Sequence, residues 1–250
     1  VSFSTPHAYQ TQYGGGDSDA FAAKLDFSQP AASQVFSVVN AASLFPGNGS
    51  SFPTGAVAPG EIVTLFGNGF GSQPSVSFDD IPAPVLYASN CQINAVVPFE
   101  VNPGLATFVS VQGSAQDKET IGPIRLPVVA AVPGIFAVGG MGTGQAAVLN
   151  QDGTPNSSSN PAALGSTVSV YMTGTGRLTP PYPVPIQGIG ATIGFVIAPV
   201  IFAGQAPGLI AGVTQVNVQI PQNAPTGDSV PITIYAGNYA SQSAVVIAVR

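Results

Sequence analysis

The sequence contains very little charge, and this shortage excludes several classes of partner. Asp, Glu, Lys and Arg together make up 6% of the 250 residues, compared with about 25% in ordinary globular domains. The net charge is −6, and the five basic residues are scattered: Lys24, Lys118, Arg125, Arg177 and Arg250. Binding to nucleic acid needs clustered Lys and Arg that neutralise phosphates. We therefore expect no nucleic-acid partner and no attachment to anionic membrane surfaces.

Side chains that usually carry chemistry are also scarce. The chain has one cysteine, Cys91, one histidine, His7, and no tryptophan. A single cysteine forms no internal disulfide, and we expect Cys91 to be a small buried residue on a strand. A transition-metal site needs several His, Cys or carboxylate ligands, and a Ser-His-Asp triad would have to use His7. We therefore predict no catalytic residues, no cofactor and no enzymatic activity.

Two short motifs could be mistaken for sites. Residues 142–147 fit the pattern Gly-x-Gly-x-x-Ala, but a dinucleotide site needs a helix next, and a strand end and a turn follow instead. Asp79 and Asp80 are adjacent, so on a strand they would point to opposite faces and could not form a two-carboxylate glycosidase site. We expect these two residues to form a turn.

Long apolar runs and helical periodicity are missing as well. The longest uncharged apolar run, 191–204, is too short to span a membrane and contains Gly194 and Pro199, so no membrane insertion is expected. Short β-type segments alternate with turns rich in the 30 glycines and 24 prolines. The start at Val1 and the few Lys and Arg residues suggest a processed protein that is extracellular or at the cell surface. The predicted fold class is all-β.

An internal repeat organises most of the chain. Residues 83–98 and 198–221 both contain an apolar strand, a turn and a second strand of the form Gln-(Ile/Val)-Asn-x-x-(Val/Ile)-Pro. Residues 59–71 likewise match 164–176, about 105 residues later, near the ~100 residues of an immunoglobulin-like sandwich. We predict two tandem immunoglobulin-like β-sandwiches preceded by an extended N-terminal strand and hairpin. The predicted domains are 1–34, 35–130 and 131–250.

The N-terminus carries a long alternating segment. Its odd positions place β-forming side chains on one face over 13 residues, longer than the roughly 5–6 residues of a typical strand. Such a strand must find an open sheet edge, in its own chain or in another. We predict that the following side chains form a subunit interface: Val1, Phe3, Thr5, His7, Tyr9, Thr11 and Tyr13.

Two further kinds of site have open alternatives. Asp17 and Asp19 lie in a glycine-rich turn, where they could ligate calcium through oxygen atoms or serve only the turn. Asn48 and Asn156 begin Asn-x-Ser sequons, so each is a candidate glycan acceptor or an ordinary loop residue.

Several motifs carry a resemblance to known families. They are Val38–Ser43, Ala58–Gly67, Gln92–Pro98, Pro133–Phe136, Gly144–Ala147, Leu149–Gly153 and Gln215–Val218. In this order they resemble the Solibacter-type C-terminal domain family, over about residues 36–250. Residues 5–26 resemble the end of a bacterial β-propeller repeat. The resemblance implies a β-rich module of large secreted bacterial proteins, without an established activity or catalytic residues.

Two functional hypotheses follow. The first is a non-enzymatic extracellular structural protein, the subunit of a homopolymeric surface filament joined by N-terminal strand donation; its partners are copies of itself. The alternative is a C-terminal adhesion or carbohydrate-binding module of a large secreted β-propeller protein, with a glycan as partner. A secreted hydrolase is a third class that no group of residues supports.

Overall fold

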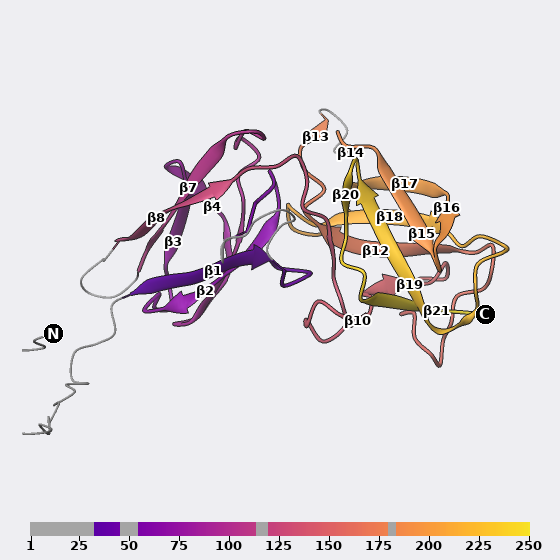
Figure 1. Ribbon diagram of the computed structural model, residues 1–250. Coiled ribbons are helices and arrows are strands. Elements are labelled where there is room, and N and C mark those ends of the chain that lie inside the picture. The colour runs from indigo at the N-terminus through magenta and orange to yellow at the C-terminus, as the bar shows by residue number, and fades with distance from the viewer. Residues whose placement is uncertain (1–32, 46–54, 114–119, 180–183) are drawn as a thin grey trace, which may run out of the picture. The chain divides into compact units, whose positions relative to one another are not determined.

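The computed structural model describes residues 33–45, 55–113, 120–179 and 184–250, and its regular elements are all β-strands (Figure 1). Within these ranges no helix is present, which confirms the predicted all-β class. The predicted N-terminal strand and hairpin, residues 1–27, lie outside the described residues.

The first half forms two sheets. One has the order β1-β2-β6-β5 and the other β4-β3-β7-β8. The strands are β1 (Gln34–Asn40), β2 (Ile62–Asn68), β3 (Ser75–Phe78), β4 (Ile81–Ala83), β5 (Val85–Ala88), β6 (Gln92–Val96), β7 (Ala106–Gln112) and β8 (Thr120–Pro127). In immunoglobulin nomenclature these orders are A-B-E-D and C′-C-F-G. The strand order itself therefore establishes an immunoglobulin-like sandwich.

The second half repeats this plan with additions. One sheet has the order β11-β12-β18-β17, and β9 also pairs with β12; the other has the order β10-β21-β19-β15-β16, and β20 also pairs with β19. The longer strands are β12 (Thr167–Thr173), β15 (Ile189–Ile193), β16 (Val196–Ala198), β17 (Val200–Gln205), β18 (Thr214–Gln219), β19 (Gly227–Ala236) and β21 (Val245–Val249). The two-residue strands are β9 (Gly134–Ile135), β10 (Gly144–Gln145), β11 (Val148–Leu149), β13 (Leu178–Thr179), β14 (Val184–Pro185) and β20 (Tyr239–Ala240). The prediction of two immunoglobulin-like sandwiches is confirmed.

Alternation along the strands builds a separate core in each sandwich. In β12, Val168, Val170 and Met172 are fully buried while the residues between them are partly exposed, as expected for a strand with one face on a core. They pack with β19 and β21 residues such as Ile232 and Ile247. The first sandwich has its own cluster, which includes Leu65, Phe78, Ile93 and Leu126.

The two repeated hairpins agree in detail. In both copies the register shifts by one residue at the same place, between Val85 and Tyr87 in the first and between Val200 and Phe202 in the second. The Gln and Asn of the repeated motif also bond in the same way: Gln92 Nε2 donates to Asn94 Oδ1 at 2.9 Å, and Gln215 Nε2 to Asn217 Oδ1 at 2.8 Å. The sequence repeat is therefore a structural repeat.

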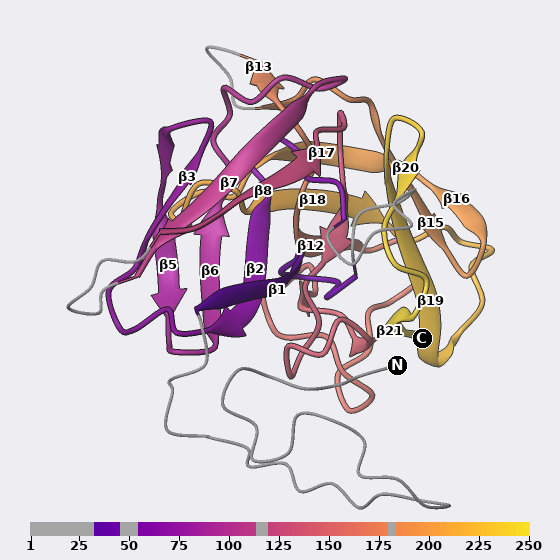
Figure 2. The same ribbon diagram turned by 60° about the vertical axis from the view of Figure 1, so that its left-hand side comes forward.

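Hydrogen bonds link the two sandwiches. The backbone N of Ile62 donates to Thr173 Oγ1 at 2.8 Å, and Thr173 Oγ1 donates to the Gly212 carbonyl at 2.7 Å. A small apolar cluster adds residues from both sandwiches, including Val96 and Val213. Residues Ala32–Arg250 form one compact unit, and Figure 2 shows the sheets of both halves within it. The predicted boundary between 130 and 131 lies between β8 and β9, and the division of this unit into two domains there stays a prediction.

The prediction for Cys91 is wrong. Cys91 is exposed and lies in the turn between β5 and β6 instead of on a strand. The turn is stabilised by Ser89 Oγ, which accepts from the backbone N of Gln92 at 3.1 Å. Ser89 therefore starts the turn, and β6 begins one residue after Cys91.

Candidate interaction surfaces

Most predicted site residues cannot be placed. Outside the described residues lie the predicted interface side chains of residues 1–13, the calcium candidates Asp17 and Asp19, and the sequon residue Asn48. Among the residues that the structure describes, no three His, Cys, Asp or Glu side chains gather into a metal-binding group. Residues 144–145 and 148–149 are strands β10 and β11, so the Gly-x-Gly-x-x-Ala segment does not lead into a helix. The described part of the chain also contains no helix long and apolar enough to cross a membrane.

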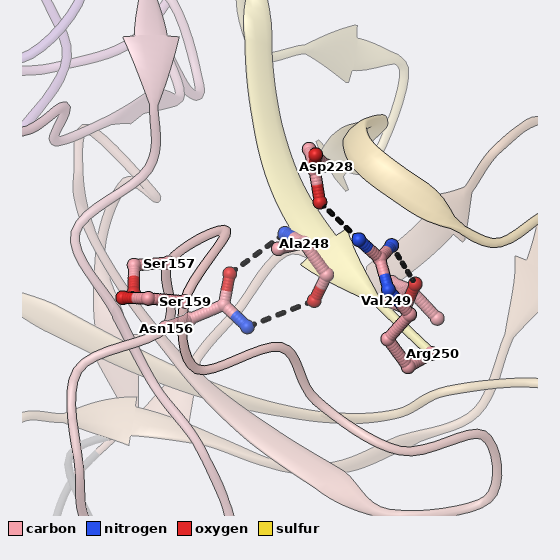
Figure 3. Close-up of polar contacts among 7 residues, drawn as sticks. All are labelled: Asn156, Ser157, Ser159, Asp228, Ala248, Val249 and Arg250. Carbon is pink, nitrogen blue, oxygen red and sulfur yellow. Dashed lines mark hydrogen bonds and ion pairs between the residues drawn. The ribbon is translucent and has the colours of Figure 1, made fainter.

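Asn156 has a structural role in the folded chain (Figure 3). Its side chain is buried, its Nδ2 donates to the Ala248 carbonyl at 2.9 Å, and its Oδ1 accepts from the Ala248 N at 2.8 Å. Nδ2 also donates to Asn150 Oδ1 at 2.9 Å. Both amide hydrogens thus bond to β21 and a neighbouring loop. Glycosylation of Asn156 stays a prediction, and it would have to take place before the chain folds.

The hairpins β3–β4 and β15–β16 have equivalent two-residue turns. Asp79 and Asp80 have φ angles of 48° and 64°, and Gly194 and Phe195 have φ angles of 57° and 66°. Positive φ at both central positions is what a type I′ hairpin turn requires. Asp tolerates this region, and Asp79 Oδ1 also accepts from the Phe108 N at 2.9 Å. The expected Asp79–Asp80 turn is present, and Phe195 holds the corresponding position in the second sandwich.

Phe195 is unusual in both conformation and exposure. A bulky side chain at positive φ is strained, and Phe195 is 86% exposed, so burial offers no compensation. The preceding position requires glycine, because a Cβ on Gly194 would meet the ring of Pro225. The turn therefore presents an aromatic ring to solvent at a cost in folding free energy.

Apolar side chains continue from this turn along the margin of the second sandwich. We call residues 195–202, which comprise the turn residue Phe195, β16 and the start of β17, the apolar edge. Four side chains are exposed there: Phe195, Ile197 (83%), Ile201 (61%) and Phe202 (38%). β16 and β17 are each the last strand in the order of their sheets, and β16 lies at the margin beside β15 in Figure 2. Exposed apolar edge strands invite pairing with another strand.

The first sandwich protects the same margin. The repeat aligns Asp80 with Phe195 and Pro82 with Ile197. Pro82 lies opposite Ser77 in β3, and Ile197 lies opposite Thr192 at the same step of β15. Charged residues and prolines on edge strands are the usual means of preventing edge-to-edge pairing. The two margins therefore differ in the charge at Asp80 and the proline at Pro82, which the second sandwich lacks. Both margins have a proline directly after the edge strand, Pro84 and Pro199.

A shallow hollow adjoins the apolar edge on the outer face of β19, β15 and β16. Its volume is about 490 Å³, and it is lined by Gly188, Ile189, Gly190, Ala191, Thr192, Ile197, Tyr235 and Gly237. Gly190 lies directly opposite Tyr235 in the sheet. An aromatic side chain beside glycines forms a flat, neutral surface, and Tyr235 and Thr192 add two hydroxyl groups.

Glu61 is a buried acidic residue at the link between the sandwiches. Its carboxylate is fully buried, Oε2 accepts from the Ala58 N at 2.7 Å, and Oε1 accepts from Asn40 Nδ2 at 2.9 Å. Asn40 Nδ2 also donates to the Val132 carbonyl at 2.8 Å. Burial raises the pKa of Glu61 to about 8, although the two hydrogen bonds lower it.

Sequence reasoning found the repeat but missed the apolar edge and the role of Glu61. The edge could have been found by comparing the two copies position by position, because Asp80–Pro82 and Phe195–Ile197 differ in charge and in proline content. Nothing in the sequence around Glu61 indicates that its side chain is buried against a residue from a distant strand.

Comparisons with known proteins add the following findings. No family model and no curated protein matches the chain. Among solved structures, the surface glycan-binding protein PbSGBP-B from Prevotella bryantii is 12% identical, with a TM-score of 0.28, over 85% of this chain and 42% of that one. SGBP-B of Bacteroides ovatus, in complex with a mixed-linkage heptasaccharide, is 14% identical, with a TM-score of 0.33, over 78% and 44%.

Titin is also among the similar structures. Its A168–A169 pair is 13% identical, with a TM-score of 0.24, over 87% of this chain and 95% of that one. The chain spans less than half the length of the two glycan-binding proteins. The resemblance to the Solibacter-type family stays a prediction, and the fold assignment rests on the strand order.

Proposed function

We propose that this chain is a non-enzymatic extracellular structural protein whose subunits join by donation of the N-terminal strand. The observation that carries the proposal is the apolar edge, because strand donation needs an acceptor edge that is open and apolar. Phe195 and Ile197 are more than four-fifths exposed there. The low charge of 6% and the resemblance to modules of secreted proteins support an extracellular location.

The energetics favour this use of the edge. Covering a fully exposed large apolar side chain is worth about 1.5–3 kcal/mol, so the largely exposed Phe195 and Ile197 supply several kcal/mol before the cost of ordering a strand. Backbone hydrogen bonds from an added strand provide further affinity. A strand from one subunit and an edge of another are different surfaces, so the contact is heterologous and gives an open filament when it does not close into a ring.

Removal of the first 13 residues tests this proposal. We expect the intact chain to form filaments in negative-stain electron microscopy at micromolar concentration. The chain lacking residues 1–13 should stay monomeric in sedimentation velocity while its β-type circular dichroism is unchanged. Filaments of the shortened chain, or a monomeric intact chain at high concentration, would show that strand donation is wrong.

A carbohydrate-binding module is the second candidate, and the hollow beside Tyr235 favours it. A sugar ring stacks on an aromatic face, and glycines at 188, 190 and 237 leave room for it. The expected result is that a monomeric chain binds neutral polysaccharides on a glycan array and that Tyr235→Ala abolishes the binding. Tyr239→Ala, at a tyrosine that does not line the hollow, is the matched control. Unchanged binding by Tyr235→Ala would exclude this surface.

A further inference from the structure

The two sandwiches differ at one backbone position that decides whether another strand can be added. Ile193 and Val196 flank the two-residue turn and face each other, so they form the hydrogen-bonded pair that closes the hairpin. Paired residues alternate between bonded and non-bonded positions along antiparallel strands. The N–H and C=O of Ile197 therefore point away from β15. At the equivalent place in the first sandwich, Pro82 has no N–H to offer.

The side chains around Ile197 extend this difference. In the second sandwich, the side chains of Phe195 and Ile197 lie beside the outward-facing N–H and C=O of Ile197 and are almost fully exposed. In the first sandwich a charged Asp80 stands where Phe195 does. Strain at Phe195 (φ 66°) persists without any contact that repays it, and retained strain of this kind is characteristic of functional positions.

The chain itself contains a segment that matches this edge. Residues 1–13 contain no Asp, Glu, Lys or Arg, and neither do residues 195–205, so pairing the two buries no unmatched charge. In the sequence, β-forming and aromatic residues occupy the odd positions of the N-terminal segment. Residues 14–32 can act as a tether, and 19 residues reach up to about 63 Å when extended at roughly 3.3 Å each.

We propose that the β16 edge of the second sandwich, centred on Ile197, is the acceptor for residues 1–13 of a second copy of the chain. This inference rests on the proposed function, since it names the surface that receives the donated strand. The added strand extends the sheet β21-β19-β15-β16 and covers Phe195 and Ile197. The first sandwich is excluded as acceptor because Pro82 removes the donor and Asp80 adds a charge.

Cysteine cross-linking between two different chains tests the pairing. In a Cys91→Ser background, one chain carries Ile197→Cys and a size tag, and the other carries a cysteine at one odd position from Val1 to Tyr13. After mixing and mild oxidation, at least one donor position should give a tagged-untagged dimer on a non-reducing gel. The matched control replaces the exposed Leu86 of the first sandwich by cysteine in the tagged chain, which keeps Asp80 and Pro82 in place, and it should give at least tenfold less dimer. Equal yields at 86 and 197, or no dimer at 197 from any donor position, would overturn the assignment.

A second variant separates this inference from the proposed function. The double variant Phe195→Asp/Ile197→Pro gives the second sandwich the edge residues of the first, and it should lose filaments while its melting temperature is unchanged or higher. If filaments persist in this variant but disappear on deletion of residues 1–13, strand donation stands and the acceptor is another edge. If filaments persist in both, the proposed function itself is wrong.

Discussion

At the scale of single residues, the buried Glu61 makes stability depend on pH. Its pKa is raised from 4.5 to about 8, so the folded state binds this proton more tightly than the unfolded state does. The stabilisation is complete below pH 4.5 and is lost as the pH rises towards 8. We expect the free energy of unfolding, measured with urea, to fall by a few kcal/mol over this range, at about 1.4 kcal/mol per pH unit.

Glu61→Gln separates this effect from other carboxylates. The variant should remove most of the pH dependence between 5 and 8. It should also cost about 1–3 kcal/mol at pH 5, because its amide NH₂ would face either the Ala58 N or Asn40 Nδ2 instead of accepting from it. Glu100→Gln, at an exposed position, should keep the slope of the unchanged protein. A slope that survives Glu61→Gln would contradict this account.

Strain at Phe195 leads to a second prediction at this scale. Phe195→Asn places a residue that tolerates positive φ in the turn, so the variant should unfold at a higher temperature, with a gain of about 1 kcal/mol. Asp80→Phe creates the same strain in the first sandwich and should cost a similar amount. Differential scanning calorimetry measures both. A loss of stability in Phe195→Asn would mean that the ring packs in the folded monomer.

At the scale of elements, the side chain of Asn156 joins its loop to β21, beside the backbone bond from the Ala162 N to the Ala248 carbonyl. Asn156→Leu leaves the buried N of Ala248 without its partner and removes the bond to Asn150 Oδ1, while the Ala248 carbonyl keeps its bond from the Ala162 N. The variant should therefore destabilise the fold by about 1–3 kcal/mol. Ser158→Ala abolishes the same sequon at an exposed position and should leave stability unchanged. Thermal unfolding compares the two, and a similar loss in both would mean that the sequon matters through a glycan.

The repeat explains how much of the fold and of the candidate site is predictable from the sequence. The two copies of Gln-(Ile/Val)-Asn predict β6 and β18, because alternating apolar residues and flanking turn residues are visible in the local sequence. The exposure of the Phe195 side chain is not predicted, because it depends on which strand lies at the edge of the sheet. Burial of Glu61 depends on Asn40 and on the chain around Val132, both distant in sequence. Neither property has a local sequence signal.

At the scale of the whole molecule, buried hydrogen bonds between the sandwiches join their stabilities. Thr173 is buried, and its hydroxyl links the Ile62 N of the first sandwich to the Gly212 carbonyl of the second. Since residues Ala32–Arg250 form one compact unit, we expect a single cooperative transition in calorimetry.

Thr173→Val keeps the shape of the side chain and removes both hydrogen bonds. It leaves the Ile62 N buried without a partner, so it should cost about 1–3 kcal/mol and separate the transition into two. Thr192→Val, on the outer face of β15 and away from the link, is the matched control and should keep one transition. Two transitions in the unchanged protein would show that the sandwiches unfold independently and that these bonds do not couple them.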